Sequence, residues 1–166
     1  ASSTAARMAS SARGEGPILD SLMVDISAQV RAREALHESD RRFQSLSSHL
    51  DGALYRSRAQ EPFVDLYFSD GVEKLTGYCA AELTGPEERY FAQVVLPEDR
   101  ERAAKQFALA KYENKTVEVE YRIRHKDGTI KWIYDRGAPS EIGADGKPLF
   151  VDGILIDVTA RKEAEA

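Results

Sequence analysis

Side chains that could do catalytic chemistry are few in this chain and far apart. The histidines are His37, His49 and His125, and the single cysteine is Cys79. A nucleophile needs a neighbouring base and a third group that orients the base. The spacing of these four residues indicates no such arrangement.

Two carboxylates at i and i+2, Glu118 and Glu120, are the other candidate pair. They alternate with apolar residues, which is typical of the water-facing side of a strand. A glycine-rich phosphate loop is also missing from the sequence. We therefore expect a protein that is not an enzyme.

Composition and net charge narrow the classes of protein to which this chain could belong. The 166 residues include Lys+Arg 23 and Asp+Glu 28, a formal charge of −5, with a pI near 5.3. This length fits one domain with appendages, and the acidity disfavours nucleic acid or an anionic membrane as partner. No apolar run reaches the ~20 residues that span a bilayer. One cysteine permits no internal disulfide, so a cytoplasmic location is expected.

The N-terminal part has two sections. Residues 1–16 are rich in Ala, Ser and Gly and read as a disordered tail or an expression remnant. Residues 17–40 read as a connector helix, in which Ser39 or Asp40 could begin a second helix. An apolar stripe at helical spacing predicts a homodimer interface on the connector; it contains Leu22, Met23, Ile26 and Val30.

Short strands and helices are predicted next. Strands are expected at 53–56 and at 64–68, the second with Val64, Leu66 and Phe68 on one face. Short helices should follow Ser69-Asp70 and cover 80–83, and Pro97 opens a longer helix. The inner face of that longer helix is predicted to contain Ala103, Ala104, Phe107 and Ala110.

The last third has the pattern of antiparallel strands. Apolar and charged residues alternate over 117–124. Hairpin turns at Asp127-Gly128 and Asp145-Gly146 lead into strands at 130–135 and 149–157. The predicted fold is α+β: a five-stranded antiparallel sheet with short helices on one face, flanked by amphipathic helices.

Three motifs in this order resemble PAS domains, the sensory boxes of bacterial signal-transduction proteins. Leu75-Thr76-Gly77-Tyr78 with Glu82-Leu83 resembles the family's L-T-G-Y-x-x-x-E-L signature. Residues 126–132 resemble its K-D-G-x-x-x-W hairpin, and residues 153–159 its closing G-x-x-x-D-I-T. The resemblance covers 41–159.

The resemblance implies a domain plan and a function. Residues 41–157 would form the PAS/PAC domain and 158–166 the start of an output helix. The chain would be a sensory module of a larger protein, of histidine kinase or diguanylate cyclase type, with a covalently attached effector. It would sense a small ligand in its core. The alternative is a ligand-free dimerisation and relay spacer in a tandem array.

The end of the last strand is the predicted relay to the effector. Asp157 and Thr159 stand where a strand gives way to a helix, so their side chains suit a helix cap. The resemblance adds a signal-relay role for Asp157, Thr159 and Gly153. It also places Trp132 on the outer face, where it would join the dimer interface.

Candidate ligand-binding residues follow from pleating and from the resemblance. They are Phe68, Tyr121, Ile123, Ile133, Asp135, Val151 and Leu155. Asp135 needs a partner because an unpaired inward carboxylate is costly. Either Arg136, Arg89 or a backbone donor supplies one, or the carboxylate faces a polar ligand or water.

The cofactor stays unknown at this stage. Haem members of the family use a histidine on the long helix, and 97–112 contains none. Light-sensing flavin members carry a reactive cysteine after the E-L-x-G segment, and none follows Gly85. Haem held by a helix histidine and a cysteinyl–flavin bond are therefore disfavoured.

A short internal similarity suggests that a further PAS unit precedes this one. Residues 24–28 are similar to residues 156–160, 157 − 25 = 132 positions later. A fixed repeat of this length implies an array. The connector would then be the exit of the preceding unit; chance similarity is the alternative.

Overall fold

The structure is a computed structural model that describes residues 16–49, 51–85 and 89–166. The side chains of residues 16–20, 22, 43–44, 47–48 and 89 lie outside that description. The predicted tail therefore lies outside the described residues except for Gly16. The chain divides into two compact units after residue 43.

One continuous helix, α1 (Gly16–Ser48), forms the N-terminal part. The second helix considered at Ser39 or Asp40 does not begin there. The chain has neither glycine nor proline at that point, and Arg42 pairs with Glu38 at 2.7 Å across one turn. In the described part of the chain, no helix is both long and apolar enough to cross a bilayer.

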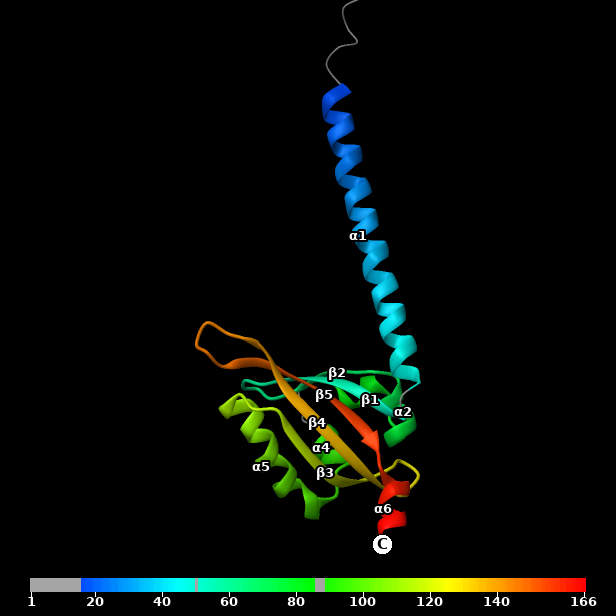
Figure 1. The fold of residues 1–166 in the computed structure, drawn as a ribbon, viewed down its shortest axis with the longest axis vertical. Coiled ribbons are helices and arrows are strands. Elements are labelled where there is room, and N and C mark those ends of the chain that lie inside the picture. The colour runs from blue at the N-terminus through cyan, green and yellow to red at the C-terminus, as the bar shows by residue number, and fades with distance from the viewer. Residues whose placement is uncertain (1–15, 50, 86–88) are drawn as a thin grey trace, which may run out of the picture. The chain divides into compact units, whose positions relative to one another are not determined.

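The second unit is built on a five-stranded antiparallel sheet (Figure 1), as predicted. Its spatial order is β2-β1-β5-β4-β3. The strands are β1 (Gly52–Arg58), β2 (Asp65–Phe68), β3 (Val117–Arg124), β4 (Ile130–Ile142) and β5 (Pro148–Asp157). β4 runs seven residues beyond the predicted end at 135 (142 − 135), because it keeps pairing with β5 as far as Ile142↔Pro148.

Short helices and one longer helix, α5, connect the two halves of the sheet. They are α2 (Gly71–Thr76), α3 (Ala80–Leu83), α4 (Arg89–Gln93) and α5 (Pro97–Glu113), and α6 (Thr159–Glu165) follows the last strand. α5 packs along β3, β4 and β5. α4 was not predicted, because one turn of helix is too short to show an apolar period.

Two predicted core positions are wrong. Ala103, Phe107 and Ala110 on the inner face of α5 are buried, whereas Ala104, predicted with them, is exposed because it borders a cavity and not the packed core. Leu66 was placed on the same face of its strand as Phe68, but it is 45% exposed whereas Phe68 is buried. It lies on the edge strand β2, beside an irregularity in the pairing with β1, where alternation is a weak guide.

Asp99 in the first turn of α5 attaches that helix to β3. Its Oδ2 accepts hydrogen bonds from the Arg122 backbone N–H at 2.8 Å and from the Arg122 side-chain Nε at 3.0 Å. Its Oδ1 accepts from Arg122 Nη2 at 2.8 Å. Hydrogen bonds from Arg122 hold the pKa of the Asp99 carboxyl below its usual range, against the opposing effect of burial.

We expect Asp99→Ala to lower the free energy of unfolding by about 1–3 kcal/mol, because it leaves the Arg122 backbone N–H without its acceptor. Urea denaturation measures the change. Glu101→Ala is the matched control on the same helix, since the pair that Glu101 forms with Lys105 is exposed. An equal, small effect of both substitutions would contradict the anchoring role of Asp99.

Candidate functional site

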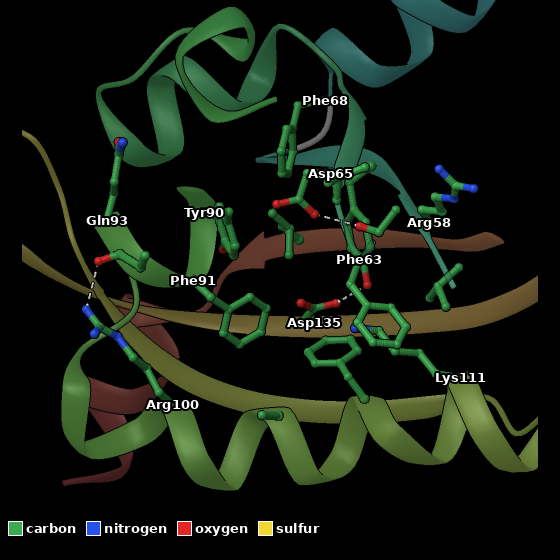
Figure 2. A pocket seen from close by; sticks show the side chains of 18 residues that line it. Arg58, Phe63, Asp65, Phe68, Tyr90, Phe91, Gln93, Arg100, Lys111 and Asp135 are labelled. Carbon is green, nitrogen blue, oxygen red and sulfur yellow. Dashed lines mark hydrogen bonds between the residues drawn. The ribbon is translucent and has the colours of Figure 1, made fainter. Parts of the chain in front are cut away.

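A cavity of about 610 Å³ lies between the sheet and helices α4 and α5. This volume is in the range of small-molecule sites. Aromatic rings form a large part of its walls; they belong to Tyr55, Phe63, Phe68, Tyr90, Phe91 and Phe107. Figure 2 shows Asp135 among these rings, between Phe91 and Phe63. The cavity therefore combines apolar walls with one buried acid.

The Asp135 carboxylate is held by tyrosine hydroxyls. Tyr55 Oη donates to Oδ1 at 2.8 Å, and Tyr121 Oη donates to Oδ2 at 2.7 Å. The hydroxyl oxygens of Tyr121 and Tyr90 lie 3.0 Å apart, which extends the network to α4. These four residues, here called the tyrosine–aspartate network, are all buried. They come from β1, β3, β4 and α4, so the network ties four elements together.

Burial controls the acidity of this network. It raises the pKa of Asp135 to about 7, although the hydrogen bonds from Tyr121 and Tyr55 act in the opposite direction. Burial also raises the pKa of Tyr55, Tyr90 and Tyr121, and the nearby Asp135 adds to each shift. Near neutral pH the tyrosines therefore stay protonated, whereas the Asp135 carboxyl group is partly protonated and partly ionised.

Two glycines make room for the ring of Tyr55. Gly153 pairs with Tyr55 on one side and with Gly137 on the other. A Cβ on Gly153 would lie 2.3 Å from Tyr55 Cζ, and a Cβ on Gly137 would lie 2.8 Å from its Oη. The Tyr55 ring therefore lies over two neighbouring residues, Gly153 and Gly137, that have no side chain. Gly153, predicted as a relay residue, has this packing role.

The predicted ligand-binding residues divide into two groups. Phe68, Asp135, Val151 and Leu155 line the cavity. Tyr121, Ile123 and Ile133 are fully buried in the core and are not among its lining residues. Tyr121 still reaches the cavity indirectly, through its hydrogen bond to Asp135.

The partners expected for Asp135 are not the ones observed. Arg136 lies on the opposite face, where its Nε is 3.5 Å from Glu118 Oε1. The Arg89 side chain lies outside the described residues. Tyr55 was missed as a partner, although Ala53 and Tyr55 at i and i+2 in one strand already indicate an inward position. The position of Tyr90 had no signal, because α4 was not predicted.

Three cations lie at the edges of the cavity. Arg100 donates to the carbonyl oxygens of Val95 and Ala92 at 3.0 and 2.9 Å. Lys111 Nζ lies 4.0 Å from the centroid of the Phe63 ring, and Arg58 is exposed at the end of β1. Asp65, which also lines the cavity, accepts a hydrogen bond from Ser57 at 2.7 Å.

Asp157 and Thr159 join the end of β5 to the neighbouring strand β4. Asp157 Oδ1 accepts from the Thr159 backbone N–H at 3.0 Å and from its hydroxyl at 2.6 Å. Thr159 Oγ1 in turn accepts from the Trp132 backbone N–H at 2.9 Å. Asp157 thus binds the first N–H of α6, as predicted, whereas Thr159 binds a strand instead of capping the helix.

Helix α6 is also held by charge. Glu120 accepts from Arg161 and is paired with Lys162, and these bonds lower the pKa of its carboxyl. Lys162 Nζ lies 4.9 Å from the centroid of the Trp132 ring, and the Arg122 guanidinium lies 5.6 Å from it. Trp132, predicted at a dimer interface, is thus half-buried against cations of its own chain.

The apolar stripe of α1 is exposed in the single chain. Met23 is 65% exposed, and Ile26 and Val30 are each 49% exposed. The Leu22 side chain lies outside the described residues. Residues 24–28 are helical here, whereas the similar residues 156–160 form a strand end and a helix start.

Metal chemistry has no support in the described residues. Across 16–49, 51–85 and 89–166, no three His, Cys, Asp or Glu side chains are grouped so that they could hold a metal ion. Cys79 is half-buried ahead of α3, and its backbone N–H donates to Glu82 Oε2 at 2.8 Å.

A five-stranded antiparallel sheet with a partly aromatic cavity between it and its covering helices is the arrangement of a class of sensory domain. The family model described as "PAS fold" matches residues 65–155, so this chain belongs to the PAS fold family. PAS domains are generally sensory modules and not catalysts.

Solved structures support the same assignment. A sensory box histidine kinase/response regulator from Burkholderia thailandensis is 29% identical with a TM-score of 0.60, covering 75% of this chain and 89% of that one. The N-terminal domain of a diguanylate cyclase with PAS/PAC sensor from Marinobacter aquaeolei has a TM-score of 0.59. It is 20% identical and covers 67% of this chain and 98% of that one, which shows the shared fold alone.

A curated relative is much longer. An uncharacterized protein of Sinorhizobium fredii is 30% identical over 141 residues, which is 85% of this chain. The chain spans only 16% of the length of that relative.

Proposed function

We propose that this chain is a non-enzymatic sensory module of a larger signal-transduction protein of histidine kinase or diguanylate cyclase type. It binds a small ligand in the cavity and passes the change through the Asp157–Thr159 junction to an attached effector. The observation that carries the proposal is the cavity itself, since Leu155 and Val151 of β5 line it only two and six residues before Asp157. The single cysteine favours a cytoplasmic location.

Native mass spectrometry and an absorption spectrum of the purified chain test ligand binding. We expect a bound mass that disappears in Ala104→Trp, because a ring at this position fills the cavity from α5. Gln106→Trp is the matched control, since Gln106 is exposed on the same helix and does not line the cavity. A bound mass retained by Ala104→Trp would place the ligand elsewhere.

Transmission through the junction gives a separate prediction. In Asp157→Ala/Thr159→Ala the Trp132 backbone N–H loses its acceptor. We expect its hydrogen exchange to accelerate at least about tenfold while the core stays folded, and the response of the attached effector to weaken. Glu163→Ala, an exposed change on α6, is the control. Outright unfolding of the double variant would remove support for a relay role.

The second candidate is a ligand-free dimerisation and relay spacer in a tandem array. The exposed Met23, Ile26 and Val30 favour it, because an apolar stripe on a charged helix suits pairing with a second copy. A colourless chain of twice the expected mass, with an empty cavity, would support this candidate. Met23→Glu should then yield the monomer.

A further inference from the structure

Among the described residues, the tyrosine–aspartate network holds no cation that would balance Asp135 when its carboxylate is ionised. A buried carboxylate is ordinarily paired with a cation. Within the described residues, the hydrogen bonds to Asp135 come from Tyr55 and Tyr121, which are neutral. Each hydroxyl supplies one donor, and each carboxylate oxygen can accept a further bond. The carboxylate has capacity for a cationic donor that the network does not supply.

The cavity around Asp135 suits an organic cation. Aromatic faces attract an ammonium group through the ring quadrupole, most strongly where water is excluded. Tyr90 and Phe91 of α4 and Phe107 of α5 line the same space as Asp135, and Phe91 and Phe107 meet edge to face with centroids 5.7 Å apart. A buried acid among such rings is a chemical match for a protonated amine.

We propose that the cavity binds a primary amine that carries an apolar ring system, with its ammonium group against Asp135 and its ring among the aromatic walls. The inference rests on the proposed ligand-sensing function and names the class of ligand. The ammonium supplies the missing positive charge, and the tyrosine hydroxyls keep the carboxylate in place.

The charged groups around the cavity set the direction of the pH dependence. Tyr55, Tyr90 and Tyr121 keep their protons because their pKa values are raised. Among the described residues, the other charged side chains of the lining are those of Arg58, Arg100 and Lys111 at the edges and Asp65 on β2. The histidines of the chain are not among the lining residues. Asp135, whose pKa burial raises to about 7, changes charge between pH 6 and pH 8.

Three probes that share an indole ring separate the possible head groups: tryptamine is cationic, tryptophol neutral and indole-3-acetate anionic. Calorimetric titration of the wild-type chain at pH 8 should give tryptamine a Kd about tenfold below that of tryptophol. The edge cations act in the opposite direction and favour indole-3-acetate. Tighter binding of indole-3-acetate or tryptophol than of tryptamine would overturn the proposal.

The pH dependence tests the role of Asp135 without any substitution. The ionised fraction of an acid with a pKa of about 7 rises from about 0.1 at pH 6 to about 0.9 at pH 8. The Kd of tryptamine should therefore fall about tenfold over this interval, whereas that of tryptophol should hardly change. A pH-independent Kd for tryptamine would contradict direct pairing with Asp135.

Variants separate this inference from the proposed function. Asp135→Asn should weaken tryptamine binding about tenfold and leave tryptophol within about twofold. Ala104→Trp should abolish binding of both probes. If another head group binds best and Ala104→Trp removes it, the cavity remains a ligand site but the amine class is wrong. If no probe binds, the amine class is overturned, and the native mass spectrum decides the proposed function alone.

Discussion

Gly153→Ala should lower the free energy of unfolding by about 1–3 kcal/mol, a large effect for one methyl group. The new Cβ would lie 2.3–2.5 Å from three atoms of the Tyr55 side chain, so the ring must move. Because Tyr55 reaches Asp135 from this position, the substitution should also break the hydrogen bond to the carboxylate. Urea denaturation measures the first effect and the Tyr55 ring signals in NMR the second.

A double-mutant cycle identifies the cause. In a Tyr55→Ala background, Gly153→Ala should cost far less than in the wild type, because the clashing ring is gone. Gly143→Ala is the matched control, since its nearest contacts are side-chain atoms at 3.1 and 3.2 Å that can move. It should change stability by no more than about 0.5 kcal/mol. Equal costs of Gly153→Ala in both backgrounds would contradict the packing argument.

The stability of the wild-type domain relative to Asp135→Asn should fall as the pH rises from about 4 to about 7. The folded state raises the pKa of Asp135 from 3.8 to about 7, so over this window it holds a proton that the unfolded chain has released. Linkage then makes stability decrease with pH, by at most roughly 4 kcal/mol, and level off above about pH 8.

In the comparison with Asp135→Asn, the contributions of the other titrating groups to the pH dependence of stability cancel. Asp99 and Glu120 have lowered pKa values, so their contribution is lost as pH falls and is the same in both proteins. Tyr55→Phe offers a second check: without its hydrogen bond the pKa of Asp135 rises further, and the window should extend to higher pH. A difference that stays flat from pH 4 to 8 would show that Asp135 is not desolvated.

Sequence reasoning was strongest for the sheet and weakest for the contacts that cross it. Alternation over 117–124 and the two Asp-Gly turns predicted the strands because period and turn chemistry are local properties. The inward direction of Asp135 was also predicted. Its partners were not, because Tyr55 lies 80 residues away and meets it only after β1 has paired with β5 and β5 with β4. Asp135 is bound by tyrosine hydroxyls, and not by an arginine guanidinium group, because this order of strands brings Tyr55 and Tyr121 to it.

The junction illustrates the same limit. Asp157 and Thr159 were predicted together from a local rule for helix starts, and the rule holds for Asp157. Thr159 serves Trp132 instead, since β4 lies beside the end of β5 and presents an N–H there. A local rule cannot anticipate that a backbone N–H of a neighbouring strand will bind the Thr159 hydroxyl. Helix α4 was missed for a related reason, as its existence depends on packing more than on its own pattern.

The strand order has a consequence for how such a domain is combined with others. The first strand and the last are neighbours, with Gly52 paired to Ile156 and the Asp157 backbone N–H donating to the Asp51 carbonyl oxygen at 3.1 Å. The polypeptide thus enters and leaves the sheet at one place. A domain of this kind can be inserted into a host chain, or removed from it, with little change in the separation of the flanking segments. This geometry makes the module easy to duplicate and exchange between proteins during evolution.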